Sequence, residues 1–305
     1  MEYFEGFDLK QIERLDLLAR QVVEGFIIGL HKSPFHGFSV EFAEHRLYNQ
    51  GESTKDIDWK VYARTDKMFV KKFEEETNLR CQIIVDISSS MYFGGEKDKL
   101  NKVQFSAVAA ACLMNLLKRQ RDAYGLSLFD EEVIEHTGCK SSTSHYQYLL
   151  SLLENVIKNP QTNKATSAAK ALHILADSIH KRSLVIIFSD MFDSADNQDE
   201  IFSALQHLRY AKHEVVLFHV VDKQKELEFE YDNRPYLFVD LESGEKIKLQ
   251  PNEVKQFYLD RITSYKEALK MKCLQYKVDF VETDINSGVY NILHTYLVKR
   301  SKMKI

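Results

Sequence analysis

The chain is poor in the residues that mark long linkers, disulfide frameworks and zinc sites. It has only four prolines and eleven glycines in 305 residues, which argues against long disordered linkers. The four cysteines, Cys81, Cys112, Cys139 and Cys273, are scattered and form no C-x-x-C pair. This spacing disfavours both a zinc site and a disulfide framework. We therefore expect reduced thiols in a cytoplasmic protein.

The chain also lacks an excess of charge of one sign, a signal peptide and a membrane span. Lys and Arg number 41 against 45 Asp and Glu, so no basic field attracts nucleic acid or anionic lipid. Residues Met1 to Asp8 contain no basic residue, unlike the start of a signal peptide. The longest apolar stretches, such as Phe105 to Leu117, are too short to span a bilayer.

Sequence motifs of common catalytic sites are absent as well. We find no G-x-x-x-x-G-K-[ST] phosphate loop, which disfavours ATP binding by this chain. No G-x-S-x-G elbow surrounds any serine, and no H-E-x-x-H pair of histidines is present. These absences disfavour a serine nucleophile and a metal site of paired histidines.

Patterns typical of buried strands alternate with helical patterns along most of the chain. The apolar runs that predict strands buried on both faces of a sheet lie at residues 80–87, 183–188 and 214–221. Helical spacing lies between and beside them, at residues 99–120, 145–156, 167–180, 198–212, 252–271 and 289–299. This alternation predicts an α/β fold of Rossmann type, with a mostly parallel sheet and helices on both faces.

Two segments depart from the alternation. Residues 1–79 predict an N-terminal amphipathic helix, Leu9 to Leu30, followed by an irregular segment rich in charge and aromatic residues, and we expect both to pack on the sheet. Residues 80–305 form the main domain. Within it, residues 226–248 alternate around Asp232-Asn233 and predict a hairpin excursion.

Polar residues follow two of the predicted strands. Asp86-x-Ser88-x-Ser90 comes directly after one strand, and Ser189-Asp190 after another. Ligands of open α/β sheets bind beyond the carboxyl ends of the strands. A few carboxylate and hydroxyl oxygens suit a hard cation such as Mg²⁺. The Asp86 turn alone is equally typical of a helix cap, and the second strand end favours a site.

These residues resemble the metal-ion-dependent adhesion site of von Willebrand factor A-like domains. Farther upstream, several motifs resemble the signature block of a bacterial family, domain of unknown function 58, whose members are typically encoded beside MoxR-type AAA+ ATPases. Those motifs are Gly37-x-Ser39-x-Glu41-Phe42, Arg46-x-Tyr48-x-x-Gly51, Ile57-Asp58-Trp59-Lys60-x-x-Ala63-Arg64-Thr65 and Phe69-Val70-Lys71-x-Phe73. The resemblance extends from about Gly37 to Asp193.

The resemblance implies a von Willebrand factor A-like domain that binds Mg²⁺, with Mn²⁺ or Ca²⁺ as alternatives. The ligands that it implies are Asp86, Ser88, Ser90, Thr166 and Asp190. It further implies an adaptor-like protein that is not an enzyme, which binds an Asp or Glu of a protein partner through the cation. A MoxR-type AAA+ ATPase would be among the partners. The chain departs from the family pattern at Asn163-Lys164-Ala165, where a Gly-rich approach to the threonine is common.

Other interpretations of the same residues stay open. A metal-dependent phosphoester hydrolase would use the same cation as a Lewis acid. It would need a general base, for which His145, Glu96 and Asp98 are the candidates nearby in sequence. A scaffold with an empty site is a third alternative.

The role of the signature block is open between two alternatives. A buried ion-pair network that ties the N-terminal segment to the sheet is favoured over an exposed binding surface, and its residues would be Asp58, Trp59, Arg64 and Lys71. Trp59 is the only tryptophan of the chain, and we expect it to anchor a core.

Overall fold

The computed structural model describes residues 15–29, 41–49, 54, 57–74, 79–95, 99–160, 168–192, 198–241 and 244–302. The chain divides into two compact units. One contains Met1–Pro34 together with Arg80–Ile305, and the other contains Phe35–Leu79. This division differs from the expected grouping of residues 1–79. The N-terminal helix α1 (Leu15–Gly29) belongs to the larger unit, because its buried apolar face packs against a helix of that unit.

The larger unit is built on a six-stranded sheet with the order β10-β7-β6-β3-β4-β5. Its strands are β3 (Arg80–Asp86), β4 (Ala123–Phe129), β5 (Val133–His136), β6 (Leu184–Ser189), β7 (Glu214–Val221) and β10 (Asp279–Asp284). Only the β4–β5 pair is antiparallel among these neighbours. The prediction of a mostly parallel α/β sheet is therefore confirmed, and the arrangement is consistent with a von Willebrand factor A-type fold.

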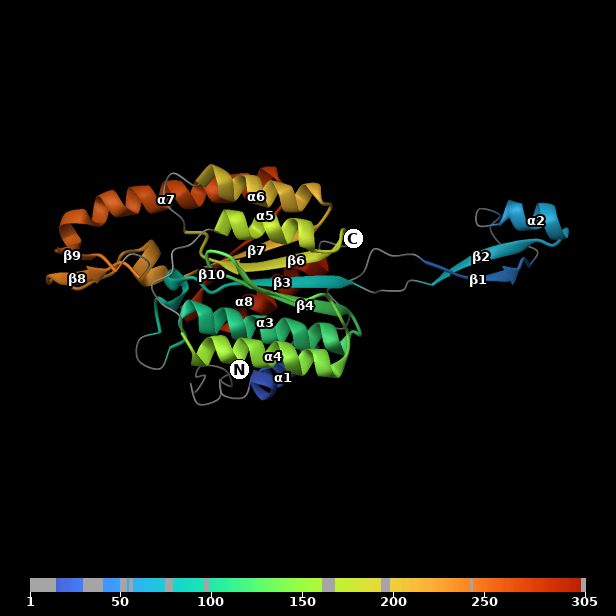
Figure 1. The fold of residues 1–305 in the computed structure, drawn as a ribbon, viewed down its shortest axis with the longest axis horizontal. Coiled ribbons are helices and arrows are strands. Elements are labelled where there is room, and N and C mark those ends of the chain that lie inside the picture. Colours follow the sequence, from blue (N-terminus) through green and yellow to red (C-terminus); the bar gives the residue numbers. More distant parts are fainter. Residues whose placement is uncertain are drawn as a thin grey trace. The chain divides into compact units, whose positions relative to one another are not determined.

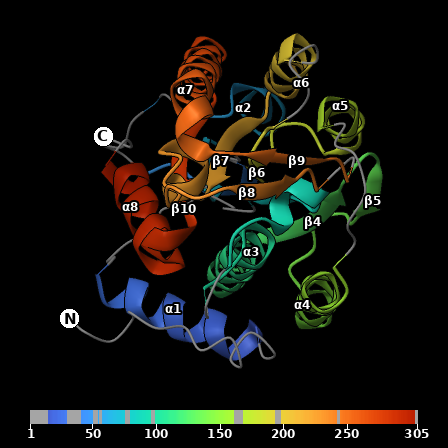
Figure 2. The same cartoon turned by 90° about the vertical axis from the view of Figure 1, so that its left-hand side faces the viewer.

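Helices cover both faces of this sheet (Figure 1, Figure 2). On one face lie α5 (Ala168–Ser178), α6 (Gln198–Tyr210) and α7 (Pro251–Gln275). On the other face lie α3 (Lys102–Arg119), α4 (Thr143–Lys158) and α8 (Val289–Lys302), with α1 packed on α3. Among the described residues, no helix combines the length and the apolar character needed to cross a bilayer.

Helix α3 is the central helix of its face and is almost entirely buried. Its first residue follows Asn101, whose side chain accepts the backbone N–H of Gln104 at 2.8 Å. The Gln104 side chain accepts the Asn101 N–H in return, at 3.1 Å. This capping box fixes where the helix begins, and it places Lys102 at the first helical position.

The strand order creates a crevice at the carboxyl ends of β3 and β6. The chain leaves β3 through α3 toward β4 on one side, and it leaves β6 through α6 toward β7 on the other side. Such a reversal is the switch point at which open α/β sheets bind ligands. Val85 lies opposite Phe188 in the register, so Asp86 and Ser189 end the two strands side by side.

The excursion after β7 differs in detail from the prediction. It begins with a π-helical turn, η5 (Lys223–Leu227), and continues to a hairpin of β8 (Tyr236–Val239) and β9 (Lys246–Leu249). The predicted hairpin turn at Asp232-Asn233 is therefore wrong. The aromatic residues near that position pack against one another, and their alternation reflects this cluster.

Helix α7 also begins differently from the expectation. The spacing predicts a helix over residues 252–271, but the helix already begins at Pro251, with Gln250 as its cap. Proline is favoured there because its missing N–H would have no partner in the helix and its φ is already helical. Pro251 therefore sets the position at which α7 begins, and Asn252 lies within the helix.

The smaller unit pairs β1 (Glu41–Leu47) antiparallel with β2 (Phe69–Glu74), and α2 (Trp59–Thr65) lies between them in sequence. Asp58 caps α2 by accepting the N–H groups of Lys60 and Val61, at 3.0 and 3.2 Å. The Trp59 side chain is 57% exposed within the unit, so the expected core anchor is wrong. Arg64 is exposed as well, which contradicts the expected buried ion-pair network.

Candidate metal centre

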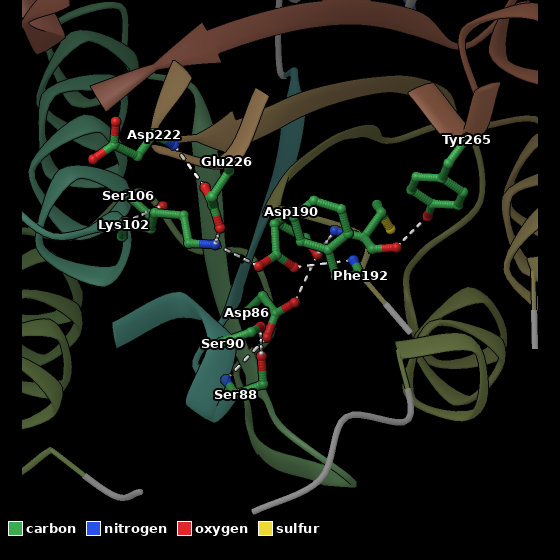
Figure 3. A network of polar contacts seen from close by, with 12 residues as sticks. Asp86, Ser88, Ser90, Lys102, Ser106, Asp190, Phe192, Asp222, Glu226 and Tyr265 are labelled. Carbon is green, nitrogen blue, oxygen red and sulfur yellow. Dashed lines mark hydrogen bonds and ion pairs between the residues drawn. The ribbon is translucent and has the colours of Figure 1, made fainter. Parts of the chain in front are cut away.

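The turn after β3 gathers one carboxylate and two hydroxyl groups. Asp86 is fully buried. Its Oδ1 accepts the backbone N–H of Ser88 at 3.0 Å, and its Oδ2 accepts the hydroxyl of Ser189 at 2.6 Å (Figure 3). A short 3-10 turn, η3 (Ser89–Tyr92), folds the chain back so that Ser88 Oγ and Ser90 Oγ lie 3.2 Å apart.

The two hydroxyl oxygens are spaced as neighbouring ligands of one cation would be. An octahedral Mg²⁺ site has metal–oxygen distances of about 2.0–2.1 Å, which places adjacent oxygens about 2.9 Å apart. The observed 3.2 Å between Ser88 Oγ and Ser90 Oγ needs only a small adjustment to reach that spacing. The residues that are present therefore fit a hard divalent cation.

Asp190 comes to the same place from β6, and both of its carboxylate oxygens have protein donors. Oδ1 accepts the N–H of Phe192 at 3.1 Å, and Oδ2 accepts the ammonium of Lys102 at 2.7 Å. Each carboxylate oxygen keeps a second lone pair, so Asp190 retains capacity to ligate a cation or one of its waters. The carboxyl ends of β3 and β6 thus bring together four of the predicted ligands, Asp86, Ser88, Ser90 and Asp190. Thr166 lies outside the described residues.

Two charged residues that the sequence interpretation missed complete the cluster. Lys102 has no exposed surface, and its Nζ lies 2.7 Å from Asp190 Oδ2 and 2.6 Å from Glu226 Oε1 (Figure 3). Glu226 belongs to η5, and its Oε2 accepts the backbone N–H of Asp222 at 2.7 Å. A lysine at the start of a helix that carries no other charged residue before Lys118 is the one sequence signal that points to this arrangement.

The cluster holds more negative than positive charge. Burial first, and then the neighbouring charge of Asp190, raise the pKa of Asp86 to about 7. Burial also raises the pKa of Glu226, against the opposing effect of Lys102. Burial by itself would lower the pKa of Lys102, but the two carboxylates that it contacts outweigh this and raise it. Among the described residues, no basic side chain forms an ion pair with Asp86.

Metal sites of other kinds are not seen in the part of the chain that the structure describes. No group of three or more His, Cys, Asp and Glu side chains is placed to hold a metal ion there. The four cysteines are all free thiols, as expected. Burial raises the pKa of Cys139 to about 11 and of Cys273 to about 12, so these thiols are protonated near pH 7 and are poor metal ligands.

One predicted candidate for a hydrolytic base lies at the wrong end of the sheet. The ring of His145 contacts the backbone oxygen of Tyr124 at 3.1 Å, near the amino end of β4. Tyr124 pairs with Cys81, five residues before Asp86 on β3, which corresponds to about 16 Å along a strand. The other two candidates, Glu96 and Asp98, lie outside the described residues.

Comparison with known proteins identifies relatives of this chain. It matches the family described as protein of unknown function DUF58 over residues 44–266. It is 25% identical over 211 residues to the uncharacterised proteins Rv1480 of Mycobacterium tuberculosis and Mb1516 of Mycobacterium bovis. These matches cover 69% of this chain and 64% of each relative, so the chain spans less than two thirds of the relatives' length.

Two solved structures are similar over most of the chain. The conserved hypothetical protein BatB from Bacteroides thetaiotaomicron has a TM-score of 0.45 and 15% identity, over 73% of this chain and 99% of that one. An aerotolerance-related membrane protein from Bacteroides fragilis has a TM-score of 0.46 and 15% identity, over 72% and 99%. Similarity at this level carries no inference about function.

Proposed function

We propose a function for this chain as a member of the DUF58 family, to which it belongs. On this proposal the protein is a cytoplasmic, adaptor-like interaction protein without enzymatic activity. Asp86, Ser88 and Ser90, with Asp190 and Thr166, hold a divalent cation, preferably Mg²⁺. A bound cation of this kind supplies an open, electrophilic position for an oxygen ligand. We propose that an Asp or Glu of a protein partner provides that ligand.

The observation that carries the proposal is the arrangement around Asp86. This carboxylate is fully buried, and within the part of the chain that the structure describes it accepts only neutral donors, the Ser88 N–H and the Ser189 O–H. Burying a charged carboxylate is costly unless a cation compensates it. The two serine hydroxyls beside it are spaced for one hard cation. Because only two of the proposed ligands are charged, the cation would keep an affinity for a further carboxylate.

The resemblance of the signature block supports a particular kind of partner. Families with this block are typically encoded beside MoxR-type AAA+ ATPases, and we include such an ATPase among the proposed partners. On this view Asp86 and the two serines hold the partner's acidic residue through the cation. The smaller unit is then available for a second contact, because Trp59 and Arg64 expose their side chains.

The first test is calorimetric titration of the purified chain with MgCl₂. The wild type should bind one Mg²⁺, whereas Asp86→Ala should show no heat of binding, because its central carboxylate is lost. Asp130→Ala is the matched control, since Asp130 is also a buried aspartate that follows a strand. That variant should bind Mg²⁺ as the wild type does. Absence of Mg²⁺, Mn²⁺ and Ca²⁺ binding by the wild-type chain would overturn the proposal.

The second test addresses the partner. Tagged wild-type chain should retain a co-expressed MoxR-type ATPase in buffer with Mg²⁺ and release it when a chelator is added. Asp86→Ala should not retain it, although its circular dichroism spectrum matches that of the wild type. Retention that is unchanged in excess chelator would contradict a role for the cation in partner binding.

A further inference from the structure

A hollow of about 600 Å³ lies beside the candidate metal centre, and half of the residues that line it are aromatic. Its aromatic residues come from two loops at the strand ends, from the excursion after β7 and from α7. They are Phe93, Phe192, Phe229, Tyr231, Phe238 and Tyr258. The volume lies within the roughly 300–1,000 Å³ that is typical of ligand pockets, which also have mostly apolar linings.

The hollow and the metal centre share residues. Ser90, one of the proposed cation ligands, lines the hollow, and so does Glu226, which contacts Lys102 beside Asp190. Phe192 also lines it, and its backbone N–H donates to Asp190 (Figure 3). The hollow therefore adjoins the metal centre at Ser90, Glu226 and Phe192, and one ligand can contact both.

The aromatic wall is built as a packed cluster that is covered only in part. Phe229 is the buried base, 8% exposed, and its ring centroid lies 4.6 Å from that of Tyr258 and 5.0 Å from that of Tyr231. Phe238 contacts Tyr231 with centroids 5.3 Å apart and remains half-buried. The wall is thus already formed, and an apolar group entering it would displace water without rearranging a core.

We infer that this hollow receives a bulky apolar side chain that stands next to the acidic residue of the protein partner. The inference rests on the proposed function, because Ser90 joins the two sites. Neighbouring residues of a chain have Cα atoms 3.8 Å apart. A partner carboxylate at the metal centre therefore places the next side chain within reach of the aromatic wall. The recognised feature is an Asp or Glu flanked by Phe, Leu or another large apolar residue.

The test uses fluorescein-labelled peptides in a Gly-Ser context, with a central Asp followed or preceded by Phe, Leu or Ser. Fluorescence polarisation with the whole chain and MgCl₂ should show binding of the Phe and Leu peptides that is roughly tenfold to a hundredfold tighter than that of the Ser peptide. Replacing the central Asp by Asn, or adding a chelator, should abolish binding of every peptide.

Two variants separate the hollow from the metal centre. Phe238→Ala should weaken binding of the Phe peptide about tenfold, leave the Ser peptide unchanged and leave the calorimetric Mg²⁺ titration unchanged. Tyr210→Ala is the matched control, because Tyr210 is 86% exposed on α6 and does not line the hollow. It should change neither peptide.

The outcomes distinguish the two proposals. Binding that needs Mg²⁺ but ignores the flanking residue would overturn the inference and leave the proposed function standing. Apolar binding that persists with a chelator would overturn it as well, because a single ligand would not be using both sites. Binding of 3-phenylpropionate as tight as that of the peptides would assign the hollow to a small acid instead. A change of sedimentation coefficient in Phe238→Ala without peptide would assign it to a second copy of the chain.

Discussion

Charged side chains are paired differently at the amino and the carboxyl ends of the parallel strands of the six-stranded sheet. At the amino end of β7, Glu214 contacts Arg300 of α8 at 2.5 Å, and Arg300 also donates to the Tyr296 hydroxyl at 3.2 Å. Glu214 and Arg300 thus form an ion pair of opposite charges. At the carboxyl ends of β3 and β6, two carboxylates, those of Asp190 and Glu226, contact the one ammonium of Lys102. Asp86 is a third buried carboxylate there, and among the described residues it has no ion-pair partner.

The charges at the amino end compensate each other, as in a structural ion pair. The carboxyl end has an excess of carboxylates and can accept a cation. A balanced ion pair satisfies both partners and fixes the position of α8 on the sheet. An excess of buried carboxylates destabilises the fold unless positive charge is supplied. Strain of this kind is usual at binding sites, where residues are retained for what they bind. Removing or titrating one charge at a time, and measuring the free energy of unfolding, tests this difference between the two ends.

The largest effect is expected for Lys102→Met. This change leaves Asp190 and Glu226 buried without their common cation, and removing one partner of a buried pair costs about 3–5 kcal/mol. Urea denaturation without added metal should show this loss in the free energy of unfolding. Lys170→Met is the control, since Lys170 and Glu132 are exposed and 3.6 Å apart, and exposed pairs contribute little. An equal effect of the two substitutions would contradict the central role of Lys102.

The next effect is a pH dependence caused by Asp86. Its pKa in the folded protein is about 7, above the value of about 4 expected for an unfolded aspartate. The folded state therefore binds more protons between these values, and the metal-free protein should lose stability as the pH rises through about 7. The contribution from this group reaches up to about 4 kcal/mol.

Urea denaturation between pH 4.5 and 8.5 measures this dependence. Asp86→Asn cannot ionise, so its unfolding free energy should vary less with pH and should exceed that of the wild type at pH 8. Saturating MgCl₂ should also reduce the slope in the wild type, because the cation favours the ionised carboxylate. A wild-type protein that becomes more stable across this range would contradict the assignment.

The smallest effect is expected at the amino end of the sheet. Arg300→Met removes charged hydrogen bonds to Glu214 and Tyr296, and such bonds contribute about 1.5–3 kcal/mol. Because Glu214 is 39% exposed, water can replace part of the contact, and the loss should be near the lower value. Thermal unfolding with and without MgCl₂ should show the same loss. A loss that Mg²⁺ reverses would mean that the two ends are coupled.

Much of the fold could be predicted from the sequence because the relevant signals are local. The apolar run at residues 214–221 predicts a strand with the bounds of β7, since a strand buried on both faces needs apolar side chains throughout. The strand ending at Asp86 was predicted for the same reason. The hairpin around Asp232-Asn233 and the burial of Trp59 were predicted wrongly, because short motifs do not report which backbone positions or which faces the tertiary structure leaves open.

Some residues of the candidate site could be predicted from the sequence as well, and others could not. Asp86, Ser88 and Ser90 could be found because they follow one strand within five residues. Lys102 could not be placed, since its contacts with Asp190 and Glu226 span 88 and 124 positions. No periodicity connects residues so far apart, and their meeting depends on which strands are neighbours.

By itself the sequence determined the alternation of strands and helices and the oxygen-rich turn at the end of β3. Both follow from side-chain periodicity and turn chemistry, which act over a few residues. Only the tertiary structure decided that β6 lies beside β3, that Lys102 enters the carboxylate cluster and that an aromatic hollow opens next to Ser90. These features arise from the order of strands and the packing of distant segments, where burial and charge act between residues that no local pattern relates.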